Sequence, residues 1–375
     1  MKLLHISDLH LGRKIYEYSM IEEQKNALNQ VLEATDKHNI ESVLIAGDIY
    51  DKSIPTVEAM ELFEWFLFEL ANKNVKVFVI SGNHDSSERV SFGAEAFKKS
   101  GIYIAKAYRG QVPCVELFDE YGEVCIHMIP FVKPAVVRHF HEGEIEDYNK
   151  ALESVVANMS YDTAKRNVVM VHQFITGAVR SDSEEVFLGG LDNVDYEIFD
   201  DFDYVAMGHI HKPQSMGRKC VRYSGSPVKY SIDEISHKKS MTVIELKEKG
   251  SISISTIEFM PLKDIRKIEG TYLELTDRSN YIDTKTDDYL HVVLNDEQDV
   301  PDALRKLKVI YPNILKLEYK NKRTAVNRQA IAPLNAKNKG VFDYISELYE
   351  MQNNQEIDKM QLKLVERLWG EGKDE

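Results

Sequence analysis

Five short clusters of aspartate, histidine and asparagine recur in the first 211 residues, and each begins where an apolar run stops. The clusters are Asp8-Leu9-His10, Gly47-Asp48-Ile49-Tyr50-Asp51, Gly82-Asn83-His84-Asp85, His172 and Gly208-His209-Ile210-His211. The runs before them are Leu3–Ile6, Val43–Ala46, Val75–Ile80, Val168–Val171 and Tyr204–Met207. Short β-branched apolar runs are typical of strands buried in an α/β fold. The pattern therefore places the polar clusters at the carboxyl ends of sheet strands, where such folds usually bind ligands.

Seven side chains in these clusters offer ligands for two divalent metal ions at one sheet edge. They are Asp8, His10, Asp48, Asn83, His172, His209 and His211. Carboxylate, amide oxygen and imidazole suit borderline-hard ions such as Mn²⁺, with Mg²⁺ as the alternative, and the absence of cysteine argues against a structural zinc site. Two metals about 3.5–4 Å apart can bind a phosphate group together and activate a water molecule for in-line displacement.

The order of the clusters predicts a role for each residue. Two ions this close need a bridging carboxylate, and Asp48 is the best candidate because its cluster is central. The other ligands would form one set of Asp8, His10 and His211 and a second set of Asn83, His172 and His209. His84 directly follows a ligand, so we expect it to face the substrate as a catalytic proton donor, with Asp85 fixing the orientation of its ring.

Taken together, the five clusters resemble the calcineurin-like metallophosphoesterase superfamily, whereas a single Asp-x-His pair would be weak evidence. Further motifs narrow the resemblance to nuclease subunits of bacterial DNA-processing complexes. They are Ser7–Gly12, Val171–Phe174 with Ser181–Glu184, and Gly208–Gln214 leading to Tyr223–Pro227. The similarity is dense over the first 235 residues and only architectural beyond them. Asp51 stands where the archaeal and eukaryotic relatives have a histidine, which fits the bacterial branch.

The resemblance implies an α/β fold: a two-sheet metallophosphoesterase sandwich flanked by helices over residues 1–260, then a small α+β capping domain over 261–319. A basic linker over 320–340 and a helical partner-binding segment over 341–375 would follow. It also implies 3′→5′ exonuclease activity on double-stranded DNA ends, endonuclease activity on single strands or hairpins, and regulation by ATP through an SbcC-type coiled-coil ATPase.

Two amphipathic helices are predicted near the C-terminus, with apolar residues at helical spacing. These residues are Val341, Phe342, Ile345, Leu348 and Tyr349 in the first helix, and Ile357, Met360, Leu364 and Leu368 in the second. Apolar faces behind a basic linker are typical of a partner site. The resemblance assigns residues 341–369 to the ATPase, and docking onto the chain's own nuclease domain is the alternative.

The predicted helix over residues 55–73 is apolar on more than one face, which indicates burial on two sides. Packing in the core is one explanation. The other, which the resemblance favours, is a homodimer in which this helix and a helix over 87–99 pack on a second copy related by a two-fold axis. In that arrangement Phe66 would point outward.

Further strands are predicted beyond Met207. Those over Val221–Ser224, Met241–Glu245 and Ile252–Ile257 would complete a second, more antiparallel sheet. In the capping domain, the predicted strands are Arg266–Ile268, Tyr272–Leu275, Leu290–Leu294 and Ile314–Tyr319, around a helix opened by Pro301-Asp302.

Composition limits the alternatives. The net charge of −14 disfavours DNA binding, although six basic residues and no acidic one lie between Lys320 and Gly340, as a DNA or partner contact or as a solvated linker. No apolar stretch approaches the roughly 18 residues of a membrane span, and the strand at the amino terminus leaves no room for a signal peptide. Three scattered cysteines favour a reducing compartment, so we expect a cytoplasmic protein.

Two other functions fit parts of the pattern. A phosphomonoesterase or cyclic-nucleotide phosphodiesterase could use the same metals, but a single-domain enzyme of that kind needs neither the capping domain nor the terminal helices. A non-catalytic scaffold of the same fold would be expected to have lost some of the seven ligands, and none is missing here.

Overall fold

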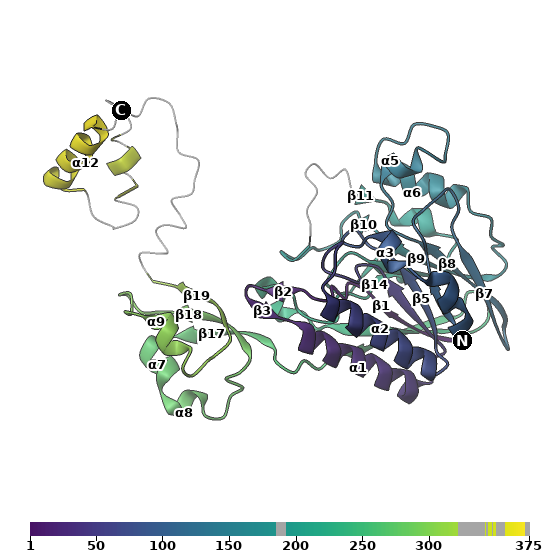
Figure 1. Cartoon of the computed structure of the whole chain (residues 1–375), viewed down its shortest axis with the longest axis horizontal. Helices are drawn as coiled ribbons and strands as arrows, with labels where there is room; N and C mark the ends of the chain where they lie inside the picture. Colours follow the sequence, from purple (N-terminus) through teal and green to yellow (C-terminus); the bar gives the residue numbers. More distant parts are fainter. Residues whose placement is uncertain (185–192, 322–341, 343, 347, 350–356, 372–375) are drawn as a thin grey trace. The chain divides into compact units, whose positions relative to one another are not determined.

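The computed structural model describes residues 1–184, 193–321, 342, 344–346, 348–349 and 357–371 (Figure 1). These residues divide into two compact units, Met1–Asp264 and Ile265–Glu375. The division lies close to the domain boundary expected after residue 260. The expected basic linker over 320–340 falls outside the described residues, apart from Lys320 and Asn321.

Two six-stranded sheets form the Met1–Asp264 unit. In spatial order, the first sheet contains β16 (Ile252–Glu258), β15 (Ser240–Leu246), β1 (Lys2–Ile6), β4 (Ser42–Ala46), β5 (Lys76–Ile80) and β6 (Ile102–Ile104). The second contains β13 (Gln214–Met216), β14 (Arg218–Tyr223), β12 (Tyr204–Gly208), β9 (Arg166–His172), β8 (Gly122–Ile129) and β7 (Cys114–Asp119). The predicted two-sheet α/β fold is confirmed.

Both faces of each sheet are buried, which explains the continuous apolar runs. In β1, Leu3 lies in the core between the sheets, whereas Leu4 and Ile6 lie in the core under the helices. The first sheet's outer face packs against α1 (Ile21–His38) and α2 (Val57–Asn72). The second packs against α5 (Pro134–Val137), α6 (Tyr148–Ala157) and the 3₁₀ helix η2 (Tyr196–Phe199). Smaller elements are β2 (Lys14–Ile15), β3 (Tyr18–Ser19), β10 (Phe174–Ile175), β11 (Asn193–Val194) and η3 (Ile232–Ser236).

Strand pairing corrects the prediction for the chain after Met207. Only β14 of the three predicted strands joins the second sheet, because β15 pairs antiparallel with β1 and β16 pairs with β15. The physical reason is an open edge: β4 occupies one side of β1, so its other side is free to accept a strand.

The helix expected over 87–99 is also corrected. The structure has three short helices there, α3 (Ser87–Val90), α4 (Ala94–Phe97) and the 3₁₀ helix η1 (Lys98–Ser100). Gly93, with φ of 75°, adopts the left-handed conformation that ends the first of them. In α2, Phe66 is fully buried and Phe68 is 61% exposed, so the expectation that Phe66 points outward is wrong.

The Ile265–Glu375 unit contains a three-stranded parallel sheet of β17 (Ile265–Gly270), β18 (Tyr289–Leu294) and β19 (Ile314–Tyr319). Its helices are α7 (Tyr272–Thr276), α8 (Arg278–Tyr281) and α9 (Ala303–Leu307), followed by α12 (Lys359–Glu371). The strand expected over Tyr272–Leu275 is wrong, because Thr271 and Glu274 form a capping box that starts α7. The predicted helix from Val341 to Tyr349 is described only in part.

Within the part of the chain that the structure describes, no helix has the length and apolar character needed to span a membrane.

Candidate metal centre

The seven predicted ligands lie where strands of both sheets end. Asp8, Asp48 and Asn83 follow β1, β4 and β5 of the first sheet. His172 ends β9, and His209 follows β12, in the second sheet. The expectation of one sheet edge is therefore corrected: the carboxyl ends of two sheets meet at this place.

Three ligands gather on one side of the centre. The ligand atoms of Asp8, His10 and His211 all lie within 4.8 Å of one another, and all three residues are buried. The Nε2 atoms of His10 and His211 are 3.0 Å apart. This is the set that the sequence predicts for one metal ion.

Asn83 organises the other side. Its Oδ1 atom lies 3.0 Å from Nε2 of His172 and 2.9 Å from Nδ1 of His209. Oδ2 of Asp48 lies 3.6 Å from Nε2 of His10 and 3.4 Å from Nε2 of His172. Asp48 therefore stands between the two sets, which is the position that a bridging carboxylate requires.

These spacings fit metal ligands. Two atoms bound at about 2.1 Å to one ion, at right angles, are about 3 Å apart. Oδ2 of Asp8 is buried and has no hydrogen-bond partner among the described residues. Because buried polar atoms are normally paired, a cation is the partner that this oxygen requires.

The charge states also suit metal binding. Burial lowers the pKa of His10 far below its usual range and that of His209 to about 3, so both rings are neutral and have a free lone pair. Burial opposes ionisation of Asp48, but the neighbouring His172 outweighs it and holds the pKa of Asp48 well below its usual range. The shared carboxylate is therefore charged.

The backbone is strained at the same place. Asp8, His10, Asp48 and His209 have φ angles of 53°, 43°, 48° and 105°. They are four of the eight non-glycine residues with positive φ in the described chain. Such conformations cost of order 1–3 kcal/mol each and cluster at functional sites.

Two motif glycines allow the loops to approach one another. A Cβ atom on Gly82 would lie 2.1 Å from Oδ1 of Asp48, and one on Gly208 would lie 1.9 Å from the carbonyl oxygen of Ala46. Any larger residue at either position would displace a ligand loop, which explains why glycine precedes Asn83 and His209.

His84 lies beside the ligands, but Asp85 does not hold its ring. Nδ1 of His84 is 3.0 Å from the carbonyl oxygen of Asp51, which can only accept a hydrogen bond. The Asp85 carboxylate instead accepts the backbone N–H groups of Ile49, Tyr50 and Gly82, at 2.8–3.1 Å. The predicted role of Asp85 is corrected: it braces two ligand loops, because three N–H donors satisfy its oxygens.

An open hollow of about 700 Å³ adjoins the centre. Its lining residues are Arg13, Lys14, Asp51, Lys52, Ser53, Asn83, His84, Ser183 and Glu184. Arg13 donates to the carbonyl oxygen of Ser183 at 2.8 Å and lies 3.6 Å from the carboxylate of Asp51. The three basic residues form a positive wall suited to phosphate, which no sequence motif indicates because they stand singly in loops.

A buried polar network supports His211. Ser183 Oγ lies 2.6 Å from its Nδ1, and Glu184 accepts its backbone N–H at 2.6 Å. Lys239 donates to its carbonyl oxygen at 2.8 Å and pairs with Glu234 at 2.6 Å. Ser183 and Glu184 belong to the Ser181–Glu184 motif, whereas no local pattern identifies Glu234 or Lys239.

Two family models match the chain. Residues 1–213 match the calcineurin-like phosphoesterase family, and residues 261–353 match the type 5 capsule protein repressor C-terminal domain. The first match includes every predicted ligand.

Curated relatives extend the similarity. The chain is 33% identical over 323 residues to the SbcD subunit of the nuclease SbcCD from Staphylococcus epidermidis, which covers 84% of this chain and 85% of the relative. The SbcD subunit from Staphylococcus saprophyticus is 33% identical over 322 residues, with 84% of each chain covered. A dimetal phosphatase structure from Danio rerio is 12% identical and covers 69% of this chain and 99% of its own, with a TM-score of 0.39, too low to inform the site.

Proposed function

The chain belongs to the calcineurin-like phosphoesterase family and, within it, to the SbcD nuclease subunits, and from this premise we propose that it is a two-metal DNA phosphodiesterase. The observation that carries the proposal is the convergence of carboxylates, an amide and neutral imidazoles beside a basic hollow. Family membership supports divalent metals in general, and the oxygen-rich donor set favours Mn²⁺, or Mg²⁺ in its place.

When bound, two such ions would neutralise the phosphate charge and activate water as the nucleophile. The chain's own residues would do the rest. Arg13, Lys14 and Lys52 would hold the phosphodiester in the hollow. His84 would give a proton to the departing ribose oxygen, and its Nε2 would deliver that proton because Nδ1–H donates to the carbonyl oxygen of Asp51.

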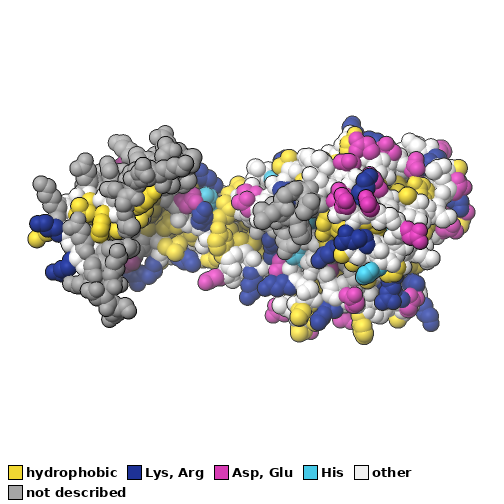
Figure 2. All heavy atoms as spheres, turned by 90° about the horizontal axis from the view of Figure 1, so that it is seen from above, with side chains coloured by type: hydrophobic (Ala, Val, Ile, Leu, Met, Phe, Trp, Pro, Cys, Tyr) yellow, Lys and Arg dark blue, Asp and Glu magenta, His cyan; other side chains and the backbone are white. Residues whose placement is uncertain are grey.

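The proposed substrates are double-stranded DNA ends, cut by a 3′→5′ exonuclease activity, and single strands or hairpins, cut by an endonuclease activity, in DNA repair, recombination and replication. The net charge of −14 opposes DNA binding, yet acidic and basic side chains are interspersed over the larger unit on the face drawn in Figure 2. No continuous acidic surface therefore repels DNA on that face, and the basic hollow supplies local attraction.

The proposed partner is an SbcC-type coiled-coil ATPase, as the name of the relatives indicates for their complex, with ATP regulating cleavage. Residues 341–369 would bind it. In α12, Met360 is 82% exposed and Leu364 is 49% exposed, which supports an apolar face available to a partner. Work on DNA with such a partner, together with three unpaired cysteines, favours the cytoplasm.

A homodimer through residues 55–73 and 87–99 is also proposed. An apolar hollow of about 360 Å³ lies between α2 and the short helices after it, lined in part by Met60, Phe68, Phe92 and Phe97. Phe92 is 84% exposed and Phe68 is 61% exposed. Large exposed aromatic side chains around an apolar hollow support burial against a second copy.

One assay tests the proposed activity against its rivals. The purified chain with Mn²⁺ should cleave a DNA hairpin and a blunt duplex, and it should prefer both to an aryl phosphodiester. Faster turnover of the aryl ester or of a phosphomonoester, with no DNA cleavage, would favour the small-substrate enzyme. No hydrolysis of any substrate, with both metals bound, would favour the scaffold.

A further inference from the structure

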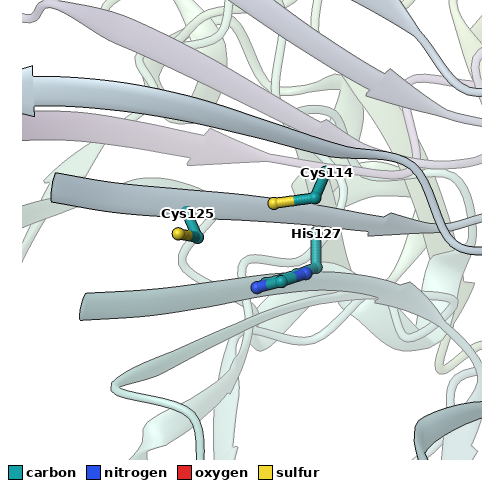
Figure 3. Close-up of side chains that lie close together, drawn as sticks. All are labelled: Cys114, Cys125 and His127. Atoms are coloured by element: carbon teal, nitrogen blue, oxygen red, sulfur yellow. The ribbon is translucent and has the colours of Figure 1, made fainter. Parts of the chain in front are cut away.

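A cluster of thiol and imidazole groups lies on the second sheet, among residues that the phosphodiesterase site does not use. Cys114 begins the edge strand β7, and Cys125 and His127 lie on its neighbour β8. Their ligand atoms, two sulfurs and one ring nitrogen, all lie within 4.8 Å of one another. Figure 3 shows the three side chains together on these strands.

The register of the two strands explains this convergence. In the antiparallel ladder Cys114 pairs with His127, and Glu116 pairs with Cys125. Because side chains alternate between faces, all four project from the same face of the sheet. The two cysteines are diagonal neighbours, whose Cα atoms lie about 7–8 Å apart in a regular sheet, too far for a disulfide without backbone movement. An ion bonded to both sulfurs can span that separation.

The thiols do not resemble redox-active cysteines. Desolvation raises the pKa of Cys114 to about 12, and the neighbouring Cys125 adds to the effect. Burial also raises the pKa of Cys125, against the opposing charge of Lys165. Reactive cysteines instead have lowered pKa values. Both thiols are therefore protonated at neutral pH, and a cation that binds them must displace their two protons into solvent.

The ring of His127 is held in a metal-binding form. Its Nε2 lies 2.9 Å from Oδ1 of Asn167. The amide nitrogen of Asn167 donates to the carbonyl oxygens of Asp162 at 2.8 Å and Lys165 at 3.1 Å, so Oδ1 is the atom that faces the ring. Nε2 therefore carries the proton, and the free lone pair is on Nδ1. Metal-binding histidines usually donate their second N–H to a fixed acceptor of this kind.

We propose that Cys114, Cys125 and His127 form a site for a thiophilic divalent cation, and that Zn²⁺ is the ion the donor set fits best. Two thiolates and one imidazole are three of the four ligands of a tetrahedral zinc site. The Glu116 carboxylate, opposite Cys125, or a solvent molecule completes it. The ion fastens the edge strand β7 to β8 and takes no part in phosphodiester cleavage.

Cobalt titration of the full chain tests this site directly. Co²⁺ bound to thiolate gives a sulfur-to-metal charge-transfer absorption, and the phosphodiesterase ligands include no cysteine to produce it. Wild type, kept reduced by a non-thiol reductant, should develop this band and saturate it with one ion per chain. Cys114→Ser and Cys125→Ser should lose the band, and added Zn²⁺ should abolish it in wild type.

The matched control is Cys220→Ser, which removes the third cysteine, on β14, outside the cluster. It should keep the band. Cys114 is exposed, so its replacement by serine leaves the fold intact and separates lost binding from misfolding. Zn²⁺ should also raise the melting temperature of Cys220→Ser more than that of Cys114→Ser. Absence of the band in wild type, or its retention in Cys114→Ser, would overturn the proposal.

Discussion

The two six-stranded sheets contribute different chemistry to the candidate metal centre. Loops after β1, β4 and β5 of the first sheet provide every predicted oxygen ligand, together with His10. The second sheet provides three imidazoles, at the end of β9 and after β12. Because His10 and His211 approach to 3.0 Å across the sheets, the full donor set exists only where the two edges meet.

The two sides are also held in place differently. Asp8, His10 and Asp48 of the first sheet lie in strained positive-φ backbone, braced by the N–H bonds that Asp85 accepts. On the second sheet, His211 is fixed through its side chain and backbone by a buried polar network. The comparison teaches that first-sheet variants should act through the shared carboxylate, whereas second-sheet variants should act on one ion at a time.

The largest effect is expected for Asp48→Ala. Loss of the shared carboxylate should remove both ions after dialysis and abolish hydrolysis of every substrate, while circular dichroism stays unchanged. His211→Ala, on the second sheet, should lose one ion and keep the other. Retention of both metals and normal turnover by Asp48→Ala would refute the bridging role.

His84→Gln should keep both ions and lose activity by about 10²–10⁴-fold, the usual contribution of a general acid. Metal content by elemental analysis and single-turnover DNA cleavage measure the two quantities separately. His209→Ala is the matched control and should lose metal. If His84→Gln loses metal as severely, His84 is a ligand rather than a proton donor.

Glu234→Gln should destabilise the second-sheet side without removing a ligand. Lys239 would remain buried without its charged partner, which costs about 3–5 kcal/mol of unfolding free energy in denaturant titrations. The control is Glu258→Gln at the exposed pair with Lys238, where about 0–1 kcal/mol is expected. Equal effects of the two variants would show that the buried network does not support the site.

The smallest effect on hydrolysis is expected far from both ligand edges. Phe68→Glu should yield monomers in sedimentation yet cleave a small phosphodiester normally, because this side chain is 61% exposed. Phe66→Glu is the contrast: this side chain is fully buried, and a carboxylate there should cost more than about 4 kcal/mol of stability. A monomeric wild type at micromolar concentration would rule out the dimer.

The ligands could be predicted from sequence because each follows a buried strand, and that relation is local. Strand partnership is not local: β15 joins the first sheet because β1 has an open edge, which no pattern within Met241–Glu245 records. Tyr272–Leu275 reads as a strand by apolar content, yet its capping box favours a helix. Glu234 and Lys239 could not be predicted because single charged residues identify their partners only after folding.

The central claim is that the two sheet edges together hold one pair of metal ions. Electron paramagnetic resonance of the full chain saturated with Mn²⁺ tests it most directly, because ions about 3.5–4 Å apart are spin-coupled. We predict the spectrum of a coupled pair in wild type and its loss in Asp48→Ala. A wild-type spectrum of isolated Mn²⁺ alone, at one or two ions per chain, would contradict the account.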